Sequence, residues 1–264
     1  MSSAAIAQLL RTVDPQQVTA FFLVLARVIP LFVLAPMFSS SMVPARVRTV
    51  IAVALAIGLE PVAAAGRHLP SAPVPIAGLV LEQLLIGGAL AFAMAAVFAA
   101  VQAAGTFLDA TAGFSFGAQL NPLTGTQDAT LTRLYTMVGT AVFVAVGGDA
   151  WVLRGLAKTF SLAPLGSGVS ITNISTGSLS AFGSIFAAAI EVAAPVMLAV
   201  LVTDIAFGMV SRVVPQLNVF AVGFPVKIGV AVIMVTATLP FMTGWLTTQL
   251  AGGVGIALRE LTGG

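Results

Sequence analysis

Long runs of apolar residues alternate with short polar segments along this chain. Each run has about the 20 residues that a helix needs to cross a bilayer, and none shows the apolar–polar alternation of an outer-membrane strand. Because Ala and Leu dominate the runs, we predict an all-α protein of the membrane class, with about six long hydrophobic helices broken by prolines. The predicted helices cover residues 18–38, 48–65, 74–105, 134–153, 182–210 and 219–250, and the connector 162–178 separates the fourth from the fifth.

Composition places the chain among membrane proteins. Of its 264 residues, 59% are hydrophobic and 8% are charged, whereas about 25% of the residues of an ordinary soluble domain are charged. The 11 Lys and Arg and the 9 Asp and Glu residues are spread singly, so no basic patch favours nucleic acid as a partner. The segment MSSAAIAQLLRTVDPQQ lacks the cationic start and the cleavage site of a signal peptide, so we expect no cleaved signal.

Candidate chemistry is sparse. The chain has no cysteine and a single histidine, His68, which cannot by itself form a zinc site. We find no His-Glu-x-x-His, P-loop or Gly-x-Ser-x-Gly motif. The stretch VGGDA at 146–150 matches the Gly-x-Gly-Asp of intramembrane aspartyl proteases only loosely, because Val146 stands in place of the first glycine. We therefore expect no catalytic residue, no metal site and no cofactor.

Charged residues within the apolar runs need an explanation, because each costs about 3 kcal/mol at the centre of a bilayer. Asp204 and Arg212 share one helix face but lie about 12 Å apart along the axis, so they cannot pair with each other. A plain serpentine of six helices would also place five Lys and Arg on each side, without the usual cytoplasmic excess. These charges, among them Arg27, Glu82, Glu191 and Asp204, therefore require other helices, a lumen or solvent.

The most polar stretch of the apolar C-terminal third is RVVPQLNVFAVGFPVK, residues 212–227. We interpret it as a turn between two long helices, with Pro215 ending the first and Pro225 opening the second. It is either a connector at the membrane surface or a contact site.

Three blocks of this chain resemble the FliR family, the flagellar biosynthetic proteins of the type III export gate, whose injectisome counterparts are similar. The blocks are residues 27–56, residues 82–122 and RVVPQLNVFAVGFPVK, and the last is the most specific. The resemblance implies a helical, cone-like assembly with FliP-like and FliQ-like subunits, raised largely out of the bilayer. It further implies a bacterial inner-membrane location in the flagellar basal body, contact with lipids and an FlhB-like gate subunit, and passage of rod and other export substrates.

The resemblance also divides the chain and assigns its sites. Residues 1–180 would be FliP-like and 181–264 a FliQ-like hairpin. A loop at 112–130 would plug the channel, with pliable glycines and obstructing aromatics: Gly113, Phe114, Phe116, Gly117, Gln119, Asn121 and Pro122. Residues expected to face other subunits or the lumen are Arg27, Glu82, Asp109, Asp204, Arg212, Pro215, Gln216, Asn218, Phe224, Pro225 and Lys227.

Three functions remain open at this point. The first is an export-gate subunit, flagellar rather than injectisome because of VGFPVK. The second is a small secondary transporter with Glu82, Asp109 or Asp204 in an ion site. The third, an intramembrane enzyme, lacks a nucleophile and base.

Overall fold

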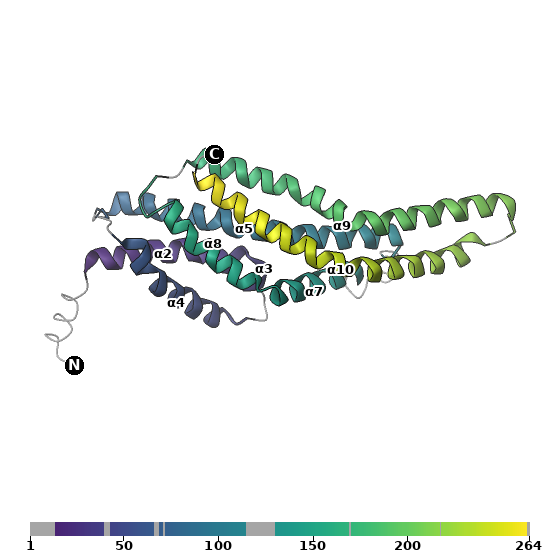
Figure 1. Cartoon of the computed structure of the whole chain (residues 1–264), viewed down its shortest axis with the longest axis horizontal. Helices are drawn as coiled ribbons and strands as arrows, with labels where there is room; N and C mark the ends of the chain where they lie inside the picture. Colours follow the sequence, from purple (N-terminus) through teal and green to yellow (C-terminus); the bar gives the residue numbers. More distant parts are fainter. Residues whose placement is uncertain are drawn as a thin grey trace. The chain divides into compact units, whose positions relative to one another are not determined.

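The computed structural model describes residues 14–39, 43–65, 69–70, 72–114, 130–168, 170–216 and 218–262. All regular structure within these residues is helical, which confirms the all-α prediction (Figure 1). The helices are α2 (Pro15–Leu34), α3 (Pro36–Ser39), α4 (Ala45–Ala64), α5 (Pro73–Ala112), α7 (Thr130–Ala145), α8 (Gly148–Leu162), α9 (Ile171–Val213) and α10 (Val219–Thr262).

Helices α2, α4, α5, α9 and α10 are each long and apolar enough to cross a membrane. The broken pair α7 and α8 passes the same test when taken together, which gives up to six candidate spans among the described residues. These helices overlap the predicted runs, but two runs are interrupted: 18–38 between α2 and α3, and 134–153 between α7 and α8. Gly147 has φ of +68°, a left-handed conformation in which the helix cannot continue, so α7 ends and α8 begins at this point.

The predicted connector 162–178 is shorter than expected, because α9 already begins at Ile171. The hydroxyl and the carbonyl of Ser170 both accept from the backbone N–H of Asn173, at 3.4 and 3.1 Å, and thereby start the helix. Thr176 then donates its hydroxyl to the carbonyl of Thr172, at 2.9 Å. Ser and Thr side chains bonded back to the helix in this way allow a polar sequence to be helical.

The chain divides into two compact units, which we describe separately. The first unit comprises Met1–Ala95, Asp149–Ala181 and Ala251–Gly264, and the second comprises Ala96–Gly148 and Phe182–Leu250. Helices α5, α9 and α10 contribute residues to both. The division into FliP-like and FliQ-like parts at residue 180 stays a prediction.

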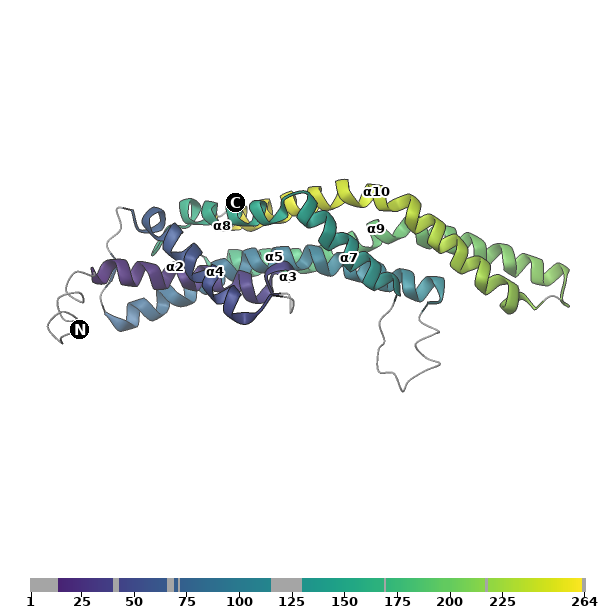
Figure 2. The same cartoon turned by 90° about the horizontal axis from the view of Figure 1, so that it is seen from below.

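In the first unit, α2 packs along α4 and against α3 (Figure 2). Asp14 caps α2 by accepting from the N–H of Gln16 at 2.9 Å, and Pro15 takes the first helical position. The Gln16 amide and the backbone of Leu69 exchange two hydrogen bonds of 2.9 Å, which tie the start of α2 to the segment before α5. The start of this helix is thus fixed both by its own cap and by a distant part of the chain.

In the second unit, α9 from Phe182 onward and α10 up to Leu250 form an antiparallel hairpin, and the two helices are drawn side by side in both Figure 1 and Figure 2. Buried residues recur every three, four or seven positions, as in a coiled-coil seam. They are Ala189, Ala193, Val196 and Val200 on α9, and Ala231, Val235, Met242 and Leu246 on α10.

The other faces of the hairpin remain apolar and uncovered. Val213 is 79% exposed and Phe241 is 78% exposed. In the most apolar window of α9 only 22% of the residues are buried inside the chain, and in that of α10 only 17% are. Apolar surface of this extent needs lipid or other protein to cover it.

Candidate functional site

The proposed plug loop begins where α5 ends. Gly113 has φ of +90°, which residues with a Cβ rarely adopt. Space is also short, because a Cβ built on Gly113 would lie 2.8 Å from Cε2 of Phe224 in α10. Phe114, the next residue, is half-buried. The chain therefore leaves α5 through a glycine that lies against an aromatic ring of the hairpin.

The remaining residues assigned to the plug fall within 115–129, outside the described residues. They are Phe116, Gly117, Gln119, Asn121 and Pro122.

Asp109 joins the helices on either side of this loop. Its carboxylate is 1% exposed and accepts from the N–H groups of Leu131 and Thr132, at 2.9 and 2.8 Å, and from the Thr132 hydroxyl at 2.8 Å. An anion at a helix N-terminus satisfies free backbone donors and is favoured by the helix dipole. Gly105 makes room for this contact, since a Cβ there would lie 2.5 Å from Cα of Thr132. Asp109 thus caps α7 from α5.

The described residues of the turn between α9 and α10, 214–216 and 218, are exposed. Asn218 caps α10 by accepting from the N–H of Ala221 at 3.1 Å. Helix α10 begins at Val219, so the prediction that Pro225 opens this helix is wrong, and Pro225 instead lies inside it. The Asn218 cap explains the difference, because it starts the helix before the proline is reached. The other residues assigned to the turn, Arg212, Pro215 and Gln216, are exposed.

Asp204 and Lys227 meet across the hairpin, with Lys227 Nζ 2.7 Å from Asp204 Oδ2. Asp204 thus contacts the other helix of the hairpin, and its expected role at another subunit or the lumen stays a prediction. The Asp204 side chain is 50% exposed and that of Lys227 is 20% exposed. An ion pair that is this open to its surroundings contributes about 0–1 kcal/mol. Its main effect is to neutralise two charges that would otherwise face an apolar environment.

Arg27 lies at the centre of the first unit and is fully buried. Its Nε and Nη2 both donate to Gln83 Oε1 of α5, the first at 2.7 Å. Nη1 donates to the Thr159 hydroxyl of α8 at 3.2 Å, and Nη2 donates to the Ala163 carbonyl at 2.7 Å. The guanidinium also stacks on Phe160, 4.2 Å from the ring centroid. One side chain of α2 thereby binds α5 and the end of α8.

Close backbone packing supports this cluster. A Cβ built on Gly87 of α5 would collide with the Arg27 carbonyl, so glycine lets α5 approach α2. Glu82 lies near enough to attract the Arg27 charge. Among the described residues, Glu82 Oε1 and Gln83 Nε2 are buried without a hydrogen-bond partner. Such groups cost free energy unless water or another chain satisfies them.

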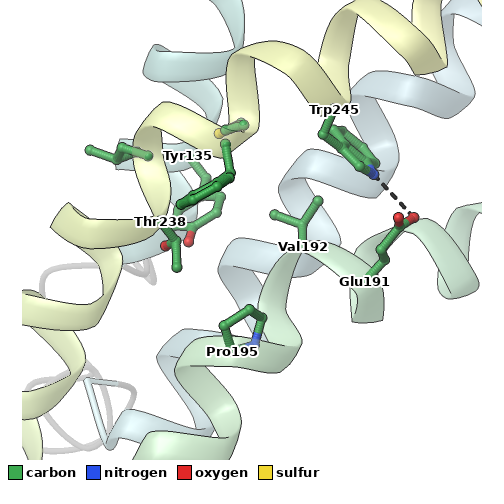
Figure 3. Close-up of a pocket in the computed structure, with 9 residues that line it drawn as sticks. Tyr135, Glu191, Val192, Pro195, Thr238 and Trp245 are labelled. Carbon is green, nitrogen blue, oxygen red and sulfur yellow. Dashed lines mark hydrogen bonds between the residues drawn. The ribbon is translucent and has the colours of Figure 1, made fainter.

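The second unit contains a pocket of about 410 Å³ between α7 and the hairpin (Figure 3). Trp245 donates its Nε1–H to Glu191 Oε2 at 3.1 Å on one side of it. The Tyr135 ring lies beside Thr238 on another side. The lining residues are Tyr135, Glu191, Val192, Pro195, Thr238, Leu239, Phe241, Met242 and Trp245.

The structure brings some of the predicted residues together and leaves others apart. Arg27 lies near Glu82, Asp204 binds Lys227, and Phe224 lies against Gly113. Whether any of the predicted residues contacts another subunit or a lumen stays a prediction. Sequence reasoning missed their partners Gln83, Thr132, Thr159 and Trp245, although a glutamine within an apolar run is a visible signal. In the part of the chain that is described, no group of three side chains is suited to hold a metal ion.

The matching family model and the similar proteins of known name agree on one family of bacterial export proteins. The model of the family "Bacterial export proteins, family 1" matches residues 18–252. The flagellar biosynthetic protein FliR of Escherichia coli K12 is 30% identical over 227 residues, which cover 84% of this chain and 85% of that protein. FliR of Bacillus subtilis is 30% identical over 226 residues, covering 81% and 84%. The surface presentation of antigens protein SpaR of Shigella flexneri is 26% identical over 220 residues, covering 79% and 80%.

Proposed function

The chain belongs to the FliR family of bacterial export proteins, and on this premise we propose that it is a membrane subunit of the flagellar type III export gate. With FliP-like and FliQ-like subunits it forms the channel through which unfolded flagellar proteins leave the cell, next to an FlhB-like gate subunit. Its location is the bacterial inner membrane, in the flagellar basal body. The observation that carries the proposal is the family match across 18–252, which covers all five candidate spans apart from the first three residues of the first span and the last residue of the fifth.

The uncovered hairpin supports a role inside an assembly. Its buried seam is made of small and medium residues, while Val213, Phe241 and other large apolar side chains remain exposed. A helical protein with a sparse core of its own and wide apolar faces gains most of its stability from neighbours. We propose that residues 181–264 occupy a FliQ-like position and residues 1–180 a FliP-like position in this assembly.

The plug belongs to the same proposal. We assign the obstruction to the loop that follows α5 and starts at Gly113 and Phe114. Its support in the described residues is the anchoring of both ends: Gly113 lies against Phe224, and Asp109 holds the first residues of α7. A loop with fixed ends can fill a lumen at rest and still yield to a passing polypeptide. Shortening the loop should let small ions through an assembled complex, and unchanged ion permeability of an intact complex would reject the plug.

A second candidate is the injectisome counterpart, because SpaR of Shigella flexneri is similar over 79% of this chain. The identities of the flagellar relatives reach 30%, and those of the SpaR relatives reach 27%. We therefore propose the flagellar role first.

Complementation tests the choice between them. The gene for this chain should restore swimming motility and secretion of flagellar proteins when its own chromosomal copy is deleted. A deletion strain that still swims, but that loses delivery of proteins into host cells, would reverse the order of the two candidates. A strain unaffected in both would reject the export role.

A further inference from the structure

The Glu191 carboxylate stands out among the acidic groups of the second unit. Asp109 receives three hydrogen bonds, and Asp204 pairs with Lys227. Within the described chain Glu191 receives one, from the neutral indole N–H of Trp245. Yet Glu191 is exposed on α9, in a helix whose most apolar window has a mean hydropathy of 2.4. An exposed carboxylate in such a helix requires a further partner.

A proline adds a second acceptor at the same place. Pro195 lies in the wall of the pocket, four residues after Glu191. Because proline has no N–H, the backbone carbonyl of Glu191 loses its usual helical donor. Glu191 thus brings to the pocket wall a carboxylate that accepts from the Trp245 N–H and a backbone carbonyl that lacks the N–H of residue 195. This arrangement favours a ligand that brings several N–H donors and a positive charge.

The rest of the wall fits an aliphatic chain with a cationic end. Val192, Leu239 and Met242 supply apolar surface, and aromatic rings lie around it (Figure 3). Long basic side chains bury their methylene groups against such surface, and their charged ends bind carboxylates and ring faces. Phe241, at the edge of the pocket, is 78% exposed and extends the apolar area over which a second helix could lie.

We propose that this pocket receives a Lys or Arg side chain from an apolar helix of a neighbouring subunit. The inference rests on the proposed role in an export complex, and it goes further by naming one contact and its chemistry. The cation neutralises Glu191, and the helix that carries it covers Phe241. Charge complementarity selects this occupant over a plain lipid tail, which would leave the carboxylate without a counter-charge.

Photo-crosslinking tests the contact in the intact complex. A photoreactive amino acid replaces Phe241 in cells that carry all the other export subunits. We expect an adduct with one polypeptide of the complex, whose crosslinked segment contains a Lys or an Arg. E191Q keeps an oxygen that can accept from Trp245 but removes the charge, so it should lower the adduct yield about tenfold. The matched variant E60Q, in α4 and outside the pocket, should leave the yield unchanged.

Exchanging the charges of the two proposed partners provides a second test. E191K should lower recovery of the complex, and a Glu in place of the crosslinked Lys or Arg of the neighbour should restore it. An adduct with lipid alone, a segment without a basic residue, an adduct insensitive to E191Q, or a failure of the exchange to restore recovery would each overturn the proposal. If the parent chain is isolated without any neighbouring subunit, the export role itself fails. If the complex is intact and only the pocket results are negative, the inference fails alone.

Discussion

Replacing Arg27 by methionine tests whether the buried polar cluster holds the first unit together. Methionine retains much of the side-chain volume but donates no hydrogen bond. Gln83 Oε1 and the Ala163 carbonyl would lose their Arg27 donors, whereas Thr159 would keep its bond to the Leu156 carbonyl. Each buried acceptor left without a donor costs about 1–3 kcal/mol, so R27M should lower the free energy of unfolding by roughly 2–6 kcal/mol.

The partner substitution Q83L separates the cluster from simple packing. It leaves the guanidinium buried without its main acceptor, which should cost about 3–5 kcal/mol. In the double variant R27M/Q83L the charge and the amide are both gone. The Arg27 donors are then missing at the Ala163 carbonyl and at the Thr159 hydroxyl, and the hydroxyl keeps its bond to the Leu156 carbonyl. The double variant should therefore be more stable than the sum of the single losses predicts, by about 0.5–3 kcal/mol.

Unfolding is followed in the purified complex by the fraction of this chain that resists protease over a temperature series. R46M serves as the matched control, because Arg46 is exposed on α4, and it should change stability by less than about 0.5 kcal/mol. Parent-like stability of R27M would refute the reasoning, and so would strict additivity of the two single variants.

Other substitutions test the loop ends, the turn and the dependence on partners. G113A should destabilise the complex, because the left-handed backbone and the Phe224 ring both oppose a Cβ, and F224A should recover part of the loss in a thermal melt. D109A should lower stability by about 2 kcal/mol through loss of the α7 cap, and D109N, which keeps one acceptor oxygen, by less; equal melting temperatures for the two variants would contradict the capping role. R212A and N218A should reduce recovery of the complex if the exposed turn contacts a neighbour, and full recovery with normal motility would make the turn a connector. Expression without partners should give degraded chain, and a protease-resistant monomer would count against coupled folding and assembly.

The helices could be predicted from the sequence because the apolar runs are long and their flanks are polar. The errors lie where a local feature overrides the pattern. Gly147 takes a left-handed conformation inside an apolar run, and Ser170 starts a helix in a segment too polar to suggest one. Asn218 starts α10 before Pro225 can. In each case a single residue sets the end of a helix, whereas the hydropathy of a window is an average over many residues and does not show that end.

The contacts at the candidate sites were harder to predict, because they join distant parts of the chain. Arg27 could be identified as a charge in need of a partner, but Gln83 is 56 residues away and Thr159 is 132 residues away. Asp109 was expected at a subunit contact or lumen, and its cap on Thr132 depends on the return of α7 to the end of α5. Periodicity within one helix carries no information on which helices meet.

Copurification tests the central claim most directly. A tagged copy of this chain, expressed from its own locus and extracted in mild detergent, should be isolated with FliP-like and FliQ-like chains in a fixed ratio, as read by native mass spectrometry. An irrelevant membrane protein with the same tag should bring down neither chain. A stable particle that contains this chain and no other subunit, from cells that make the whole export apparatus, would contradict the account.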